Sequence, residues 1–236
     1  MVEITGELMK RDIEQHLLNW KNQASLKPLV LRGARQVGKT YVVKKFASTH
    51  FEHFININFE LEPRFISCFD SLDTAKIIPM LQVVAKQTII PGKSLIFFDE
   101  IQECPQALVA LRYFKEQMPG LHVVAAGSLL EFCLNQEEFR MPVGRVQFLY
   151  LYPMSFKEYL YASGNQHLLN YLQEITLTDG VNPAIHQSAL EEFTSYMAIG
   201  GMPDAVTHFI EHRDYNHVDV IQRAILETYR GDFGKY

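Results

Sequence analysis

The sequence predicts an α/β fold, in which helices cover both faces of a mainly parallel, five-stranded sheet, followed by a small all-helical region. Three observations support this prediction. Strand-length apolar runs alternate with helical patterns up to about residue 152, the order that right-handed βαβ units require. The strand expected at 94–99, with its apolar run from Leu95 to Phe98, is too apolar to be half-exposed and suits a sheet covered on both faces. Beyond residue 153, only helical patterns occur. We therefore expect a three-layer α/β part at 1–152 and a helical part at 153–236.

The α/β part opens with a helix at 11–21, because Ile13, Leu17 and Trp20 recur at helical spacing. The strands that follow are continuously apolar or alternating, and we expect them at 28–32, 54–59, 94–99, 122–126 and 146–151. Amphipathic stretches between the strands predict helices at 40–47, 73–87 and 105–118. Ligands of such sheets bind at the carboxyl ends of the strands, which is where a site should be sought.

The helical part is divided by short linkers and by its Gly and Pro residues. Helices are expected at 155–163, 168–175, 185–199, 203–212 and 217–229. The first has Ser155 as its cap and Glu158 three residues later, the pattern of a capping box. Gly200-Gly201-Met202-Pro203 ends one helix and starts the next, and its tightness makes it a candidate hinge.

Composition narrows the classes of protein. The chain has 236 residues and a net charge of −5, which argues against broad, non-specific nucleic-acid binding but leaves room for a local basic patch. The cysteines Cys68, Cys104 and Cys133 form no C-x-x-C pair, so buried, reduced thiols are expected. No apolar run has membrane-spanning length, and the N-terminus lacks the pattern of a secretory signal. We expect a cytoplasmic protein without a membrane partner.

Residues 33–40 read Gly-Ala-Arg-Gln-Val-Gly-Lys-Thr, the G-x-x-x-x-G-K-T phosphate-binding loop, and they lie between an expected strand and an expected helix. The glycines let successive N–H groups point into one concavity. Lys39 reaches the outer phosphates and the Thr40 hydroxyl holds Mg²⁺. A Gly-rich turn without function is the weaker alternative, because strand, loop and helix follow in the required order. The residues expected at the nucleotide are Gly33, Ala34, Arg35, Gln36, Val37, Gly38, Lys39, Thr40 and Tyr41.

Asp99 ends the most apolar expected strand, and Glu100 comes directly after it. These two carboxylates can supply the metal ligand and the base that a phosphate loop lacks. Asp99 can hold Mg²⁺ through its waters, and Glu100 can polarise an attacking water. Such a pair favours hydrolysis over transfer to a small acceptor. Ser128 follows the next strand, where it can contact the γ-phosphate or cap the helix expected from Leu129, and the sequence leaves both roles open.

Charge that develops on a transferred phosphoryl group usually requires a further cation. Arg145, in Val143-Gly144-Arg145 before the fifth strand, is the first candidate. Arg140 is the second and Arg112 the third. Whether such an arginine serves its own chain or a neighbouring copy does not follow from the sequence.

Several of these segments together resemble a known family. The phosphate loop, Phe-Phe-Asp-Glu-Ile-Gln at 97–102 and Ala-Gly-Ser-Leu-Leu-Glu at 126–131 resemble prokaryotic P-loop ATPases of the AAA superfamily. The segments 143–160 and 200–206, the latter reading Gly-Gly-Met-Pro-Asp-Ala-Val, resemble the subgroup that carries a C-terminal domain of unknown function. The resemblance runs from about Arg11 to Tyr236, where that domain would begin.

The resemblance implies a P-loop NTPase sandwich that uses ATP and Mg²⁺, with Lys39, Thr40, Asp99 and Glu100 in the roles given above. It also implies that Ser128 stands at the sensor position. The favoured function is hydrolysis of ATP coupled to movement of the helical region, which is also the candidate surface for self-association or a protein partner.

Two other functions stay open. A nucleotide-binding switch with negligible turnover shares the same loop, as does a small-molecule kinase. The kinase is disfavoured because no arginine-rich lid is evident, and a GTPase because no N-K-x-D sequence is present. The biological process, and any role of nucleic acid, do not follow from the sequence.

Overall fold

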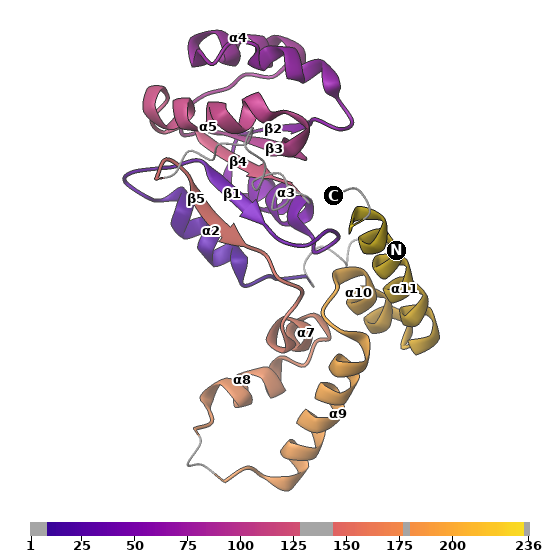
Figure 1. Cartoon of the computed structure of the whole chain (residues 1–236). Helices are drawn as coiled ribbons and strands as arrows, with labels where there is room; N and C mark the ends of the chain where they lie inside the picture. Colours follow the sequence, from indigo (N-terminus) through magenta and orange to yellow (C-terminus); the bar gives the residue numbers. More distant parts are fainter. Residues whose placement is uncertain (1–8, 128–143, 177–179, 234–236) are drawn as a thin grey trace. The chain divides into compact units, whose positions relative to one another are not determined.

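The computed structural model describes residues 9–127, 144–176 and 180–233. The chain divides into two compact units, one made of residues 13–151 and the other of the residues up to 12 together with those from 152 onward (Figure 1). We call them the sheet unit and the helical unit. The division falls one residue before the expected boundary. Residues 9–12, which the expected α/β part includes, are grouped with the helical unit.

The sheet unit contains one five-stranded sheet with the strand order β2-β3-β4-β1-β5. The strands are β1 (Leu29–Arg32), β2 (His53–Asn58), β3 (Ser94–Asp99), β4 (His122–Ala126) and β5 (Gln147–Tyr150). All four neighbouring pairs are parallel, so the prediction of a mainly parallel sheet is confirmed. All of β3 and β4 is buried, which explains the continuously apolar runs 95–98 and 123–126 within them.

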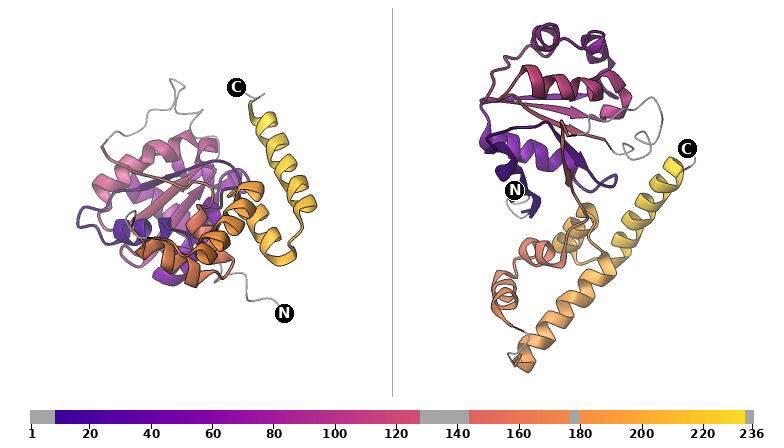
Figure 2. Two further views of the ribbon diagram at one scale, coloured as in Figure 1. Left: turned by 90° about the horizontal axis from the view of Figure 1, so that it is seen from below. Right: turned by 60° about the vertical axis from the view of Figure 1, so that its left-hand side comes forward.

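Helices cover both faces of this sheet, as the two further views show (Figure 2). One face packs against α2 (Ile13–Lys21) and α3 (Lys39–His50). The other face packs against the 3-10 helix η1 (Pro63–Phe69), α4 (Thr74–Ala85) and α5 (Pro105–Gln117). A short 3-10 turn, η2 (Ile101–Glu103), links β3 to α5. The three-layer arrangement is therefore confirmed. The 3-10 helix η1 was not predicted from the sequence.

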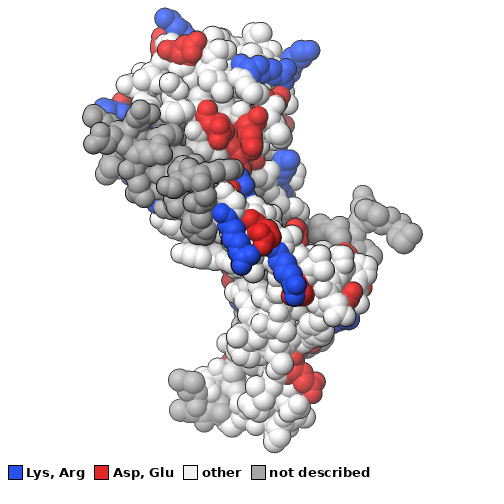
Figure 3. Space-filling view, turned by 45° about the vertical axis from the view of Figure 1, so that its right-hand side comes forward, with Lys and Arg blue, Asp and Glu red and all other residues white. Residues whose placement is uncertain are grey.

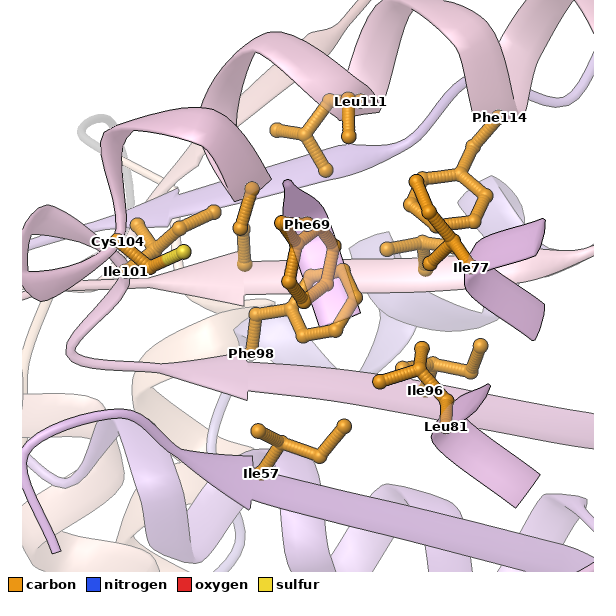
Figure 4. Close-up of a cluster of buried hydrophobic side chains, with 14 of the residues drawn as sticks. Ile57, Phe69, Ile77, Leu81, Ile96, Phe98, Ile101, Cys104, Leu111 and Phe114 are labelled. Atoms are coloured by element: carbon orange, nitrogen blue, oxygen red, sulfur yellow. The ribbon is translucent and has the colours of Figure 1, made fainter. Parts of the chain in front are cut away.

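The larger core cluster lies between the sheet and α4, α5 and η1 (Figure 4). Phe98 of β3 is fully buried there, with Phe69 edge-on at 5.4 Å and Phe114 at 6.1 Å between ring centroids. Aromatic pairs of this kind add roughly 0.5–1.5 kcal/mol to the free energy gained by burying their surfaces. This core holds β3 rigidly, and so fixes the residues that follow it.

The helical unit is built from α7 (Phe156–Ala162), α8 (Gln166–Glu174), α9 (Pro183–Ile199), α10 (Pro203–His212) and α11 (Tyr215–Phe233). The predicted capping box is confirmed, because the Ser155 hydroxyl accepts from the Glu158 N–H and a Glu158 carboxylate oxygen accepts from the Ser155 N–H. Tyr159 and Phe209 are buried at the centre of the unit.

A buried ion pair ties the N-terminal residues to the helical unit. Arg11 Nε lies 3.1 Å from Glu158 Oε1, and both side chains are almost fully buried. Arg11 Nη2 also donates to the Tyr152 carbonyl at 2.6 Å, and the Asp12 N–H donates to Glu158 at 2.7 Å. Burial of a charge requires such partners, which explains why residues 9–12 leave the α/β part.

A search of the described helices for a membrane span finds none that is both long and apolar enough to cross a bilayer.

Candidate functional site

The loop 33–38 follows β1 at the carboxyl edge of the sheet and leads directly into α3, whose first residue is Lys39. Its backbone visits the left-handed region at Gln36, with φ of 64°, and at Gly38, with φ of 95°. Left-handed residues turn consecutive N–H groups toward one side, and the N-terminus of α3 adds its partial positive charge. The geometry is that of an anion-binding loop.

Gly33 is required by its surroundings as well as by its φ of 149°. A Cβ atom at this position would lie 2.2 Å from the carbonyl oxygen of Leu151. Leu151 is the residue that follows β5, and its N–H donates to the Arg32 carbonyl at 2.8 Å. The first glycine of the loop therefore packs directly against the backbone that leaves β5.

Lys39 lies inside the loop. Its Nζ donates to the carbonyls of Gly33 at 2.8 Å and Ala34 at 2.9 Å, and the residue is 8 % exposed. Burial lowers the pKa of Lys39, although the negative charges of Glu100 and Asp99 raise it. A buried ammonium with a lowered pKa gains from a further anion, and a phosphate is such an anion.

Thr40 and Asp99 meet across the sheet edge. The Thr40 hydroxyl donates to Asp99 Oδ2 at 2.8 Å, although β4 lies between the strands that precede these residues. Burial raises the pKa of Asp99, against the hydrogen bond from Thr40, which lowers it. A bound cation would offset that burial by favouring the ionised carboxylate.

A hydroxyl and a carboxylate oxygen at this separation are the ligand types that Mg²⁺ prefers, so the residues fit the expected ion. Among the described residues, no group of three or more His, Cys, Asp or Glu side chains is placed to hold a metal. Mg²⁺ bound here would therefore take its remaining ligands from water and from a nucleotide, which is its usual manner of binding.

Glu100 has a left-handed backbone, with φ of 50° and ψ of 48°. Such a conformation is costly for a residue with a Cβ and is concentrated at functional sites. Its N–H donates to Asp99 Oδ1 at 3.2 Å, and its Oε2 accepts a hydrogen bond from Gln102 Nε2 at 2.7 Å. The carboxylate therefore stands beside Asp99 and is held by a side chain that the sequence analysis did not single out.

The remaining loop residues differ in what they present. Val37 is fully buried in the core below the loop, so it can offer a ligand only its backbone. Ala34 and Gln36 are exposed, and Tyr41 is 42 % exposed in the first turn of α3. Ser128, Arg140 and Cys133 lie outside the described residues, whereas Gly127, which follows β4, is buried at the same edge of the sheet.

The structure does not bring Arg145 to the phosphate loop. Arg145 precedes β5, and β5 runs parallel to β1 with Gln147 opposite Leu29. It therefore lies at the amino edge of the sheet, whereas the loop follows the carboxyl edge. Its Nε lies 2.9 Å from Glu116, which also binds Arg112. Both arginines are therefore paired with Glu116 in this structure.

Charge is distributed unevenly around the sheet unit. Figure 3 shows a group of Asp and Glu side chains on the drawn face of this unit, with Lys and Arg side chains scattered around it. No continuous basic surface is visible on the described part of that face. Together with the net charge of −5, this gives no support for a broad nucleic-acid surface there.

Comparison with known proteins gives a family and a fold. A family profile described as "AAA domain" matches residues 25–160, more than half of the chain. The Walker-type ATPase of Pyrococcus abyssi has a similar structure, with a TM-score of 0.53 and 16 % sequence identity, over 96 % of this chain and 74 % of that one. That likeness shows the fold alone.

One curated relative is an uncharacterised protein of Methanocaldococcus jannaschii, 23 % identical over 240 aligned residues. The match covers 95 % of this chain but 47 % of the relative, so the chain spans about half of the length of the curated protein it matches.

Proposed function

The chain belongs to the AAA domain family of nucleotide-binding, ATPase-type proteins, and on this premise we propose that it binds ATP with Mg²⁺ and hydrolyses it. The observation that carries the proposal is the meeting of three groups at one loop. Lys39 lies inside the loop, and the Thr40 hydroxyl is 2.8 Å from the Asp99 carboxylate. Together they offer a triphosphate a cation, backbone donors and oxygen ligands for its metal.

Each residue has a defined part in the proposed hydrolysis. Lys39 and the loop N–H groups bind the β- and γ-phosphates, and Thr40 with Asp99 would hold Mg²⁺, which when bound neutralises charge on the phosphate oxygens. Glu100 orients a water and accepts its proton as the water oxygen bonds to the γ-phosphorus. The bond from that phosphorus to the β–γ bridging oxygen breaks, giving ADP and inorganic phosphate.

We propose further that Arg145 acts on the site of a neighbouring copy. Arg145 lies at the amino edge, away from the loop that follows the carboxyl edge, and its side chain is 51 % exposed and so accessible to another chain. A head-to-tail contact, in which the amino edge of one copy faces the carboxyl edge of the next, would bring the two together. The proposal therefore includes self-association.

The segment 151–154 joins the sheet unit to the helical unit in the chain, and it is closely packed at each end. At one end, the Leu151 carbonyl packs on Gly33 of the phosphate loop. At the other end, the Met154 N–H donates to Gly201 at 2.6 Å, and a Cβ on Gly201 would lie 2.2 Å from the Met154 carbonyl. We propose that movement of the loop is transmitted along this segment, and that a protein partner would bind the helical unit.

The test is ATP hydrolysis with Mg²⁺ over a concentration series of the chain. Lys39→Ala should abolish turnover, and Glu100→Gln should lower kcat by roughly 10²–10⁴ while retaining nucleotide binding, as expected on loss of a general base. Normal hydrolysis by Glu100→Gln would refute the assignment of Glu100.

A mixing experiment tests Arg145. Arg145→Ala carries an intact loop and Lys39→Ala an intact arginine, so each is expected to be inactive alone. If Arg145 acts between copies, a mixture of the two should regain part of the wild-type activity. Arg112→Ala, which removes the other arginine bound to Glu116, is the matched control and should hydrolyse normally. Failure of the mixture to regain activity contradicts the intermolecular role.

A nucleotide-binding switch remains the second candidate, and the position of Arg145 favours it. A site that lacks the additional cation within its own chain would hydrolyse slowly, because such an arginine contributes about 10³–10⁵ in rate. Tight ATP binding without turnover at any concentration would support the switch over the ATPase.

A further inference from the structure

Gln102 is a buried side chain placed next to the proposed catalytic carboxylate. It lies in the 3-10 turn η2, two residues after Glu100, and is 8 % exposed. Its Nε2 donates to Glu100 Oε2 at 2.7 Å, the length of a strong hydrogen bond to a charged acceptor. No role of Gln102 follows from the phosphate loop or from the metal ligands.

Packing does not explain an amide at this position. The Gln102 Oε1 atom is buried and has no hydrogen-bond partner. A buried acceptor without a partner destabilises the fold, and an apolar side chain of similar length would avoid that cost. The amide cannot simply turn over to relieve it, because its oxygen would then face the negatively charged Glu100. Within the part of the chain that the structure describes, the hydrogen bond to Glu100 is the favourable polar contact of this amide.

The backbone of Glu100 shows why such a contact matters. Glu100 is left-handed at φ 50°, at the sharp turn where β3 gives way to η2. This turn fixes the position of Cα, but a glutamate side chain has three further rotatable bonds, which free in solution carry about 1.5–2 kcal/mol of conformational entropy. A second contact is required to fix the carboxylate itself. Gln102 provides one, because its Nε2 donates to Glu100 Oε2.

We propose that Gln102 is a positioning residue that holds the Glu100 carboxylate in its working orientation before water is attacked. The inference rests on the proposed ATPase function and names a further residue of the same site. In this proposal Gln102 acts through its hydrogen bond to Glu100 and not by binding the nucleotide. Preorganisation of this kind raises the rate of the chemical step without strengthening ground-state binding.

The test substitutes Gln102→Met, which keeps the length of the side chain and removes the donor. The kcat for ATP hydrolysis should fall about tenfold, which corresponds to about 1.4 kcal/mol. KM and the equilibrium dissociation constant for ATP should stay within twofold, and the thermal midpoint should stay equal or rise. The matched control is Gln82→Met, since Gln82 is a half-buried amide of the same unit whose Oε1 accepts from the Ile89 N–H. This control should keep the wild-type kcat.

A double variant separates positioning from a general structural effect. If Gln102 acts through Glu100, adding Gln102→Met to Glu100→Gln should cause no further loss of kcat. An equal tenfold loss in both backgrounds would overturn the inference, as would wild-type kcat in Gln102→Met. Those failures leave the ATPase proposal intact, because the wild-type chain would still hydrolyse ATP. Absence of wild-type turnover at every concentration refutes the ATPase proposal, and the inference about Gln102 falls with it.

Discussion

At the scale of single residues, Lys39 and Asp99 of the site are buried, and burial disfavours the charged form of each side chain. Burial lowers the pKa of Lys39 and raises the pKa of Asp99. For Asp99 this direction persists although Lys39 and the Thr40 hydrogen bond both act against it. In the absence of a ligand, the ionised carboxylate therefore destabilises the fold relative to its protonated form, by the linkage between pKa and stability. A site prepared for a charged ligand lowers the stability of the free protein.

The raised pKa of Asp99 predicts that Asp99→Asn stabilises the free protein. The variant keeps an acceptor for Thr40, loses the 3.2 Å contact of Oδ1 with the Glu100 N–H and removes the buried charge. Burial of the charge outweighs that contact, so the free protein should become more stable by on the order of 1 kcal/mol, about 2–4 °C in Tm for a chain of this length. Thermal unfolding without nucleotide measures the gain, and Asp70→Asn, at an exposed carboxylate, is the control with a change near zero. Binding of ATP with Mg²⁺ should weaken in the same variant. A lower Tm for Asp99→Asn would contradict the argument.

Whether a predicted residue lies at the site depends on which end of a strand it adjoins. The phosphate loop follows β1 and Asp99 is the last residue of β3, so the parallel sheet carries both to its carboxyl edge. Arg145 precedes β5 and is carried to the other edge. The motif is local and could be predicted from sequence. Gln102 could not, because its contact depends on the left-handed backbone of Glu100, which the sequence does not reveal.

At the scale of elements, apolar spacing predicted the centre of each helix and strand, and its ends less well. The helix expected at 185–199 begins at Pro183, because Asn182 caps it by accepting from the Ala184 N–H. The helix expected at 217–229 runs from Tyr215 to Phe233. The 3-10 helix η1 was missed because seven residues of 3-10 geometry show no 3.6-residue period, although they bury Phe65 and Phe69.

The first residue of β4 predicts how the sheet unit responds to pH. His122 is buried between Trp20 and Phe51, and burial lowers its pKa from the ordinary 6.5. The unfolded chain therefore binds a proton at a pH where the folded chain does not, and His122 makes the free energy of unfolding fall as pH drops below about 6.5. Stability from this residue is fully present above that pH.

Urea unfolding at pH 7.5 and 5.5 measures this dependence. His122→Gln, which cannot titrate, should reduce the difference between the two midpoints. His16→Gln, which removes an exposed imidazole of the same unit, should keep the wild-type difference. An unchanged difference in His122→Gln would mean that other groups account for the pH dependence.

At the scale of the whole molecule, the division into units depends on a contact between distant parts of the sequence. Arg11 and Glu158 are 147 residues apart and form a buried ion pair. Glu158 forms half of the capping box that was predicted, but no pattern in the sequence indicates that it also pairs with Arg11. A short motif can predict a hydrogen bond between neighbouring residues. Whether two residues 147 positions apart form an ion pair depends on how the whole chain packs. The expected three-layer and helical parts were nonetheless found.

Removal of Arg11 should therefore destabilise the helical unit strongly. Arg11→Met leaves Glu158 buried without its cation, a change that costs roughly 3–5 kcal/mol in comparable pairs. Lys157→Met removes the exposed pair with Asp12, in which both side chains are about half exposed, and should cost at most about 1 kcal/mol. Chemical denaturation of both variants measures the contrast, and equal losses would show that the buried pair does not stabilise the unit.

The same contact sets an order of events during synthesis. Arg11 is synthesised 147 residues before Glu158, an interval of roughly 7–30 s at 5–20 residues per second. Within that interval the whole of 13–151 has been made and can fold as a unit. Arg11 thus stays hydrated until translation reaches Glu158 and supplies the anion with which it becomes buried.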